Sequence, residues 1–141
     1  MLEKAKMLAE KAHQGQVDKG GHPYILHPVR VAENCKGEKE KVIALLHDVL
    51  EDSTYTREDL KKEGFSEDIL EGLVCLTHRA GEAYMEYIER ICQNPLAVKV
   101  KYADLQDNMD LSRIPNPTEK DFARLEKYKI AKARIEEALK G

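Results

Sequence analysis

Four side chains that can bind a metal ion or move a proton lie within one short segment: His47, Asp48, Glu51 and Asp52. Apolar residues at helical spacing from Val42 to Leu50 place these four on the opposite face of a predicted helix. Carboxylates in the last turn of a helix face the negative end of its dipole, which costs a few tenths to about 1 kcal/mol each. No Lys or Arg lies within the segment to offset them. The pattern indicates either a divalent metal site or a solvated helix face.

A second acidic residue stands out in the helix predicted to run from Pro95 to about Leu111. That helix carries apolar residues on two faces, which is typical of a buried element. Asp104 lies on one of these faces, with Asn108 one turn further along the chain. A buried carboxylate is costly unless it is paired or binds a metal. The alternative to a metal is an ion pair with a nearby lysine, Lys99 or Lys101.

The segment from Gln14 to Leu26 is predicted to be a loop because it is rich in glycine. It contains Lys19, and a short helix with Pro28 in its first turn follows it. Backbone N–H groups and a lysine at such a place can hold a phosphate, although glycine-rich loops are common. His27 precedes Pro28, and a lone histidine of this kind is more often structural or exposed than a ligand.

The composition excludes several classes of protein. The chain has 141 residues, of which 23 are basic and 26 acidic, with a formal net charge of −3. This length predicts one domain over residues 1–141, and the balanced charge argues against binding to nucleic acid. The longest apolar run, Val42 to Leu46, is far shorter than the roughly 20 residues of a membrane span. Three widely spaced cysteines and an N-terminus without a signal pattern predict a reduced, cytoplasmic protein.

Helical periodicity extends over nearly the whole chain, and no segment shows the alternation of a strand. The predicted fold is therefore all-α, a compact multi-helix bundle in a single domain. Thr56 and Ser66 are predicted N-caps, and Gly81 is predicted to open a further helix. The expected helices cover residues 1–13, 28–35, about 38 to 52, 81–91 and 95–111, with two helices after the caps at 56 and 66 and a long final helix that carries Phe122 to Ala138.

Three segments together resemble the HD-domain phosphohydrolases, in particular the hydrolase domain of the RelA/SpoT alarmone enzymes and the small alarmone hydrolases. They read AHQGQVDKGGHPYILHP, ALLHDVLEDS and VKYADLQDNM, in the order and spacing of that family. The resemblance implies that His27, His47, Asp48 and Asp104 bind one divalent ion, usually manganese. Nitrogen and carboxylate ligands without a thiolate suit manganese or iron.

The same resemblance assigns roles to further residues. Glu51 and Asp52 match the catalytic acids, which orient or deprotonate the attacking water. Lys19 and Asn108 match positions that contact the nucleotide. The resemblance also implies that three further residues shape the same pocket: His13, Tyr24 and Lys101.

Two positions depart from the family pattern. Asp18 stands where members that cleave guanosine tetraphosphate usually carry an arginine that stacks on the base, and Asp107 stands where a histidine is common. We therefore expect hydrolysis to be retained. Asp18 lies at a position that contacts the base, so we expect the recognition of guanine to be altered. The expected activity is removal of phosphate or pyrophosphate from a nucleotide, with the 3′-pyrophosphate of (p)ppGpp as the first candidate. The alternatives are another nucleotide substrate or a non-catalytic nucleotide sensor.

Overall fold

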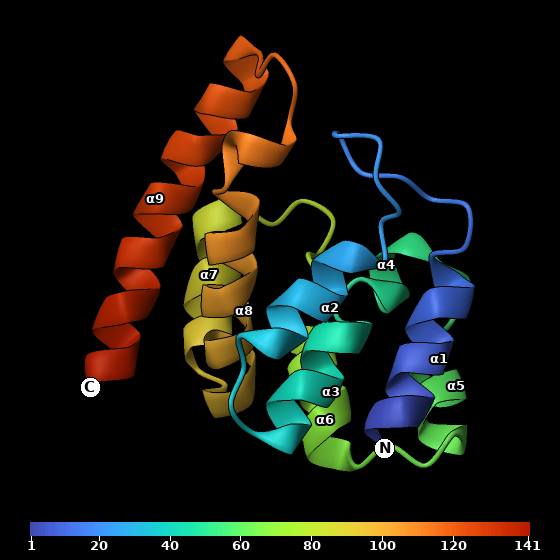
Figure 1. The fold of residues 1–141 in the computed structure, drawn as a ribbon. Helices are drawn as coiled ribbons and strands as arrows, with labels where there is room; N and C mark the ends of the chain where they lie inside the picture. Colours follow the sequence, from blue (N-terminus) through green and yellow to red (C-terminus); the bar gives the residue numbers. More distant parts are fainter.

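The protein is entirely helical in a computed structural model that describes all of residues 1–141. Outside the helices there is only one isolated β-bridge, between Val17 and Pro23. Figure 1 shows the helices packed side by side into one bundle, which confirms the predicted all-α fold. The α-helices are α1 (Leu2–Ala12), α2 (Leu26–Glu33), α3 (Glu38–Leu46), α4 (Val49–Asp52), α5 (Arg57–Lys62), α6 (Glu67–Cys75), α7 (Tyr84–Cys92), α8 (Pro95–Asn108) and α9 (Glu119–Lys140).

Helix α3 lies at the centre of the bundle and packs against α1, α2, α6 and α8. Its apolar side chains, among them Ile43 and Leu46, are completely buried. A Cβ atom at Gly72 of α6 would lie 2.8 Å from Cδ1 of Ile43, so the absence of a side chain there permits the close approach of α6 to α3. Because α3 is held on several sides, its C-terminal end, where His47 lies, has a fixed position in the bundle.

The helix predicted from Glu38 to Asp52 is wrong as one element, because the chain turns at His47 and Asp48 between α3 and α4. Nδ1 of His47 lies 2.5 Å from the carbonyl oxygen of Ala44. In a continued helix that carbonyl would accept the backbone N–H of Asp48. The side chain of His47 thus takes the place of a helical hydrogen bond, and Glu51 and Asp52 lie in a separate one-turn helix.

Other helix ends follow the predicted signals with small shifts. Thr56 caps α5 and shares a capping box with Asp59, as predicted. Helix α6 begins after Ser66, but the hydroxyl of Ser66 donates to Asp68 and makes no cap hydrogen bond. Gly81 has φ 77°, so it belongs to the turn before α7, which begins three residues later.

The loop before α2 and the segment between α8 and α9 lie at the same end of the molecule (Figure 1). A Cβ atom on Gly20 would lie 2.3 Å from the carbonyl oxygen of Arg113, so the two segments pack backbone against backbone there. Lys19 and Asp121, the latter in the first turn of α9, form an ion pair of 3.4 Å. None of the helices has both the length and the apolar composition needed to cross a membrane.

Candidate metal centre and adjoining cavity

His27, His47 and Asp104 form a buried cluster at the centre of the molecule. Nε2 of His27 lies 2.9 Å from Oδ1 of Asp104, and Nε2 of His47 lies 3.2 Å from the same oxygen. Oδ2 of Asp48 is 3.2 Å from Nε2 of His47. The structure therefore groups three of the four side chains that the sequence suggested as metal ligands, and places the fourth, Asp48, beside His47.

Three separate elements position these side chains. His27 lies in the first turn of α2, Asp104 lies in the middle of α8, and α2 packs against α8. His47 and Asp48 occupy the turn between α3 and α4, where the helical rotation between neighbouring residues is interrupted. This turn lets two consecutive residues face one point.

Both imidazole rings are oriented by a partner at Nδ1. His47 has the Ala44 carbonyl there, and Nδ1 of His27 lies 2.6 Å from Oδ2 of Asp107. When these Nδ1 atoms donate, a neutral imidazole has an unshared electron pair at Nε2. In both histidines the unshared electron pair at Nε2 would then point at the carboxylate of Asp104. The arrangement is stable only with positive charge between the groups, and two nitrogen and two carboxylate ligands suit a divalent ion such as manganese or iron.

The electrostatics of the cluster favour positive charge. Burial lowers the pKa of His27, but the hydrogen bonds to Asp104 and Asp107 outweigh it and raise the pKa to about 10. Burial likewise disfavours the charged form of His47, yet Asp48 and Asp104 raise its pKa. Burial alone would raise the pKa of Asp104, and the charge of Lys101 leads the interactions that hold it well below its usual range. Protons or a metal ion can supply the charge that these carboxylates demand.

Lys101 belongs to this buried network. Its Nζ atom lies 2.9 Å from Oδ2 of Asp104 and 5.2 Å from the centre of the Tyr87 ring. The ion pair considered from the sequence is thus present with Lys101, whereas Lys99 pairs with Glu40 on the surface. Lys101 does not line the cavity described below, so the structure does not bring it to the expected nucleotide pocket.

Glu51 and Asp52 lie beside the cluster and make no hydrogen bond or ion pair with it. Oε1 of Glu51 accepts a hydrogen bond of 2.6 Å from the backbone N–H of His78. Burial and the charge of Asp48 raise the pKa of Asp52. Neither acid forms an ion pair with a lysine or arginine, so the excess negative charge predicted for this segment is present in the structure.

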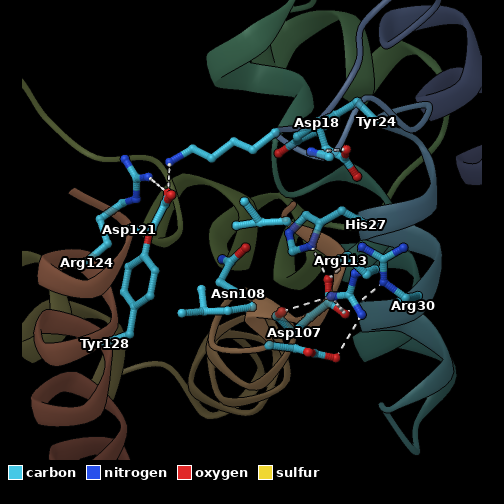
Figure 2. A pocket seen from close by; sticks show the side chains of 15 residues that line it. Asp18, Tyr24, His27, Arg30, Asp107, Asn108, Arg113, Asp121, Arg124 and Tyr128 are labelled. Carbon is cyan, nitrogen blue, oxygen red and sulfur yellow. Dashed lines mark hydrogen bonds and ion pairs between the residues drawn. The ribbon is translucent and has the colours of Figure 1, made fainter. Parts of the chain in front are cut away.

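A cavity of about 350 Å³ opens beside the cluster, between the loop before α2 and the first turns of α9 (Figure 2). His27 and Asn108 line it next to the cluster, and Nδ2 of Asn108 donates to Oδ1 of Asp104 at 3.2 Å. Tyr24 also lines it, and its hydroxyl donates to Oδ2 of Asp48 at 2.5 Å. The cavity is therefore continuous with the candidate metal centre. His13 is buried next to the Tyr24 ring, 4.9 Å between ring centres, and does not line the cavity.

Asp18 and Lys19 reach the cavity from the loop. Oδ1 of Asp18 accepts hydrogen bonds of 2.9 Å from the backbone N–H groups of Gly20 and His22, so this carboxylate shapes the loop itself. Lys19 pairs with Asp121 rather than with its neighbour Asp18. Its side chain is half exposed, which leaves its charge available to an anionic ligand.

Sequence reasoning missed most of the cationic lining. Arg30, Arg113 and Arg124 all line the cavity, together with Asp121 and Tyr128. Figure 2 shows Arg124 pointing at Asp121 at one side, and Arg30 and Arg113 converging on Asp107 at the other. Lys19 forms an ion pair with the same Asp121. Only Arg30 could have been found from the sequence, because it lies one helical turn after His27 in α2.

Comparisons with known proteins agree with the resemblance based on the three motifs. No protein-family model matches the chain. It is 51% identical over 61 residues to a guanosine-3′,5′-bis(diphosphate) 3′-pyrophosphohydrolase of Haemophilus influenzae, a match that covers 40% of this chain and 9% of the relative. It is 34% identical over 122 residues to the bifunctional (p)ppGpp synthase/hydrolase SpoT of Escherichia coli, which covers 77% of this chain and 17% of the relative.

The guanosine-3′,5′-bis(diphosphate) 3′-pyrophosphohydrolase of Aquifex aeolicus is 29% identical over 147 residues, a match that covers 96% of this chain and 20% of the relative. The chain thus spans a fifth or less of these curated relatives. In fold it matches a solved metazoan ortholog of SpoT, described as hydrolysing ppGpp, with a TM-score of 0.79 and 25% identity. That match covers 99% of this chain and 85% of the other, and it supports an HD-domain, (p)ppGpp-hydrolase-like protein.

Proposed function

We propose that this chain, which resembles the RelA/SpoT alarmone hydrolases in sequence and in fold, is a metal-dependent hydrolase of (p)ppGpp. The observation that carries the proposal is the buried cluster of His27, His47 and Asp104 beside a cavity whose lining includes one lysine and three arginines, each of them ion-paired with an aspartate. A phosphate group can compete with these aspartates for the basic side chains, and the cluster has the donor atoms for one divalent ion. Residues 1–141 would form one hydrolase domain.

His27, His47, Asp48 and Asp104 would hold the ion, with manganese as the first choice. When bound, such an ion supplies Lewis acidity and lowers the pKa of water toward neutrality. The chain itself sets the geometry, because the Nδ1 partners of both histidines direct Nε2 toward Asp104. The three reduced cysteines agree with a cytoplasmic enzyme.

Glu51 and Asp52 would orient the attacking water and accept its proton. In ppGpp, the oxygen of this water forms a bond to the phosphorus that is attached to the 3′ oxygen of the ribose. The bond between that phosphorus and the 3′ oxygen then breaks. The 3′ oxygen takes up a proton, so the products are pyrophosphate and GDP. The pKa of Asp52, raised by burial and by Asp48, suits a group that receives a proton.

The cavity would bind the nucleotide. Lys19 and Arg124 both contact Asp121, and a phosphate group of the substrate can compete for their charges. Asn108 projects from α8 next to the metal ligands and can donate to an oxygen of the substrate.

Asp18 favours a second candidate, the same chemistry on a nucleotide other than (p)ppGpp. Its carboxylate lies at the cavity, where it cannot stack on a purine as an arginine can. It also adds negative charge close to the place of a polyphosphate.

The test is a hydrolysis assay of the purified chain with manganese and ppGpp, with GDP and pyrophosphate measured separately. We expect both products in equal amounts, and none after the metal is removed with a chelator. The adenine analogue of ppGpp, assayed in parallel, decides between the two candidates. Stabilisation by ppGpp without release of products would show a nucleotide sensor and overturn the proposed activity.

A further inference from the structure

Asp107 occupies a special place relative to the candidate metal centre. It lies one turn after Asp104 on α8, and the two carboxylates contact the two nitrogens of one imidazole ring, that of His27. The Asp107 side chain is only 8% exposed, and its Oδ2 lies 2.6 Å from Nδ1 of His27.

Two arginines hold the Asp107 carboxylate in place. Arg30 donates from Nε to Oδ1 at 2.8 Å and from its terminal nitrogen to Oδ2 at 3.1 Å. Arg113 donates to Oδ1 at 3.0 Å and to the Asp107 carbonyl at 3.1 Å. Such paired, charge-assisted hydrogen bonds keep the carboxylate ionised and fix its direction. Oδ2 is therefore presented to His27 by a rigid support.

We propose that Asp107 is a positioning residue that accepts the Nδ1 proton of His27 and so directs the free electron pair of Nε2 toward the metal ion. The inference rests on the proposed metal site. Carboxylates behind a ligating histidine fix its tautomer and raise its basicity, and their loss typically weakens metal binding about 10- to 100-fold. Arg30 and Arg113 act one step further out, through Asp107.

The competing explanation is that Asp107 only ties α2, α8 and the segment before α9 together through its arginines. This role predicts lower thermal stability after substitution but unchanged metal affinity. Asp107→Asn separates the two, because asparagine has nearly the same size and can still accept a hydrogen bond, although it lacks the charge that makes the imidazole basic.

Binding of manganese to the metal-free chain of 141 residues is measured from the electron paramagnetic resonance signal of the free ion. We expect Asp107→Asn to weaken binding about 10- to 100-fold. The matched control is Asp110→Asn, which removes a carboxylate that also pairs with Arg113 but makes no contact with a histidine. We expect it to leave the manganese affinity unchanged. Equal affinity of Asp107→Asn and the wild type would overturn the inference.

Two further measurements keep the result unambiguous. Asp104→Ala in the same assay tests the metal site itself: loss of binding there with normal binding by Asp107→Asn refutes only the role of Asp107, whereas normal binding by both refutes the site as well. Nitrogen-15 NMR of the wild-type chain loaded with zinc, a diamagnetic ion, is independent of any variant. It should show a protonated, slowly exchanging Nδ1 in His27, and a proton on Nε2 alone would overturn the inference.

Discussion

The carboxylate of Glu51 is hydrogen-bonded through Oε1 to the backbone N–H of His78, at 2.6 Å. This contact joins α4 to the connection between α6 and α7, far along the chain. A backbone donor holds Glu51 at a fixed place next to the turn that carries His47 and Asp48, while its second oxygen makes no hydrogen bond to the protein. The residue therefore has both a fixed position and a free acceptor.

Glu51→Gln should lower the hydrolysis rate about 10²- to 10⁴-fold, the usual effect of losing a general base. The amide oxygen can still accept the His78 N–H, so we expect the melting temperature and the manganese content to stay at wild-type values. Glu51→Ala is the companion variant, which should lose the same activity and in addition some stability. Normal turnover by Glu51→Gln would assign this acid to structure alone.

Removal of the metal should lower the melting temperature of the wild type, because an ion that binds the native state stabilises it. The expected stabilisation is about 2.7 kcal/mol when the ion is present at 100 times its dissociation constant. Asp104→Asn should abolish this dependence on manganese, and elemental analysis should find it free of metal. Undiminished metal in that variant would contradict the assignment of Asp104 as a ligand.

Asp18→Asn should improve binding of ppGpp and of its adenine analogue alike, since it removes a negative charge and keeps the acceptor for Gly20 and His22. We expect KM to fall about fivefold, which corresponds to about 1 kcal/mol of repulsion. Asp18→Arg should favour ppGpp over the analogue through stacking on the base, at some cost in stability from the lost loop hydrogen bonds. A strong preference of the wild type for ppGpp that neither substitution alters would show that guanine is read elsewhere.

Glu82 should make the stability of the protein depend on pH. Its hydrogen bonds with Arg90 lower the pKa of Glu82 from 4.5 to about 2. The pair therefore stabilises the native state above about pH 4.5, and this contribution disappears as the pH falls toward 2. Glu82→Gln should unfold at lower urea concentration than the wild type at pH 7, and the difference should shrink between pH 5 and pH 3. A difference that is independent of pH would exclude the ionised pair as its cause.

Much of the helical architecture could be predicted from local sequence, since apolar periodicity and caps such as Thr56 act over a few residues. The turn at His47 could not be predicted, because Val49 and Leu50 continue the apolar pattern of α3 and conceal the break. What ends α3 there is a side-chain hydrogen bond to Ala44, which leaves no trace in the periodicity.

In the candidate site, too, local motifs could be predicted from the sequence, whereas contacts made by tertiary packing could not. The four expected ligand positions could be named from the sequence because the motifs around them are short and specific. The cationic lining could not, since Arg113 and Arg124 reach the cavity only through the packing of α9 and the segment before it. Asp107 was noticed as a departure from a pattern, but its contact with His27 spans 80 positions along the chain and required the tertiary structure.

The ion pair between Lys19 and Asp121 connects positions 102 residues apart, and it has a consequence for synthesis on the ribosome. All four predicted ligands are translated by residue 104, whereas Asp121, Arg124 and Tyr128 emerge later. A nascent chain that has reached α8 thus already contains the four side chains proposed to bind a metal ion, but one wall of the adjoining cavity does not yet exist. If these side chains bind a metal ion, the groups for binding it are encoded before the cavity is complete, and a product that ends before α9 would keep them while lacking one wall of the cavity.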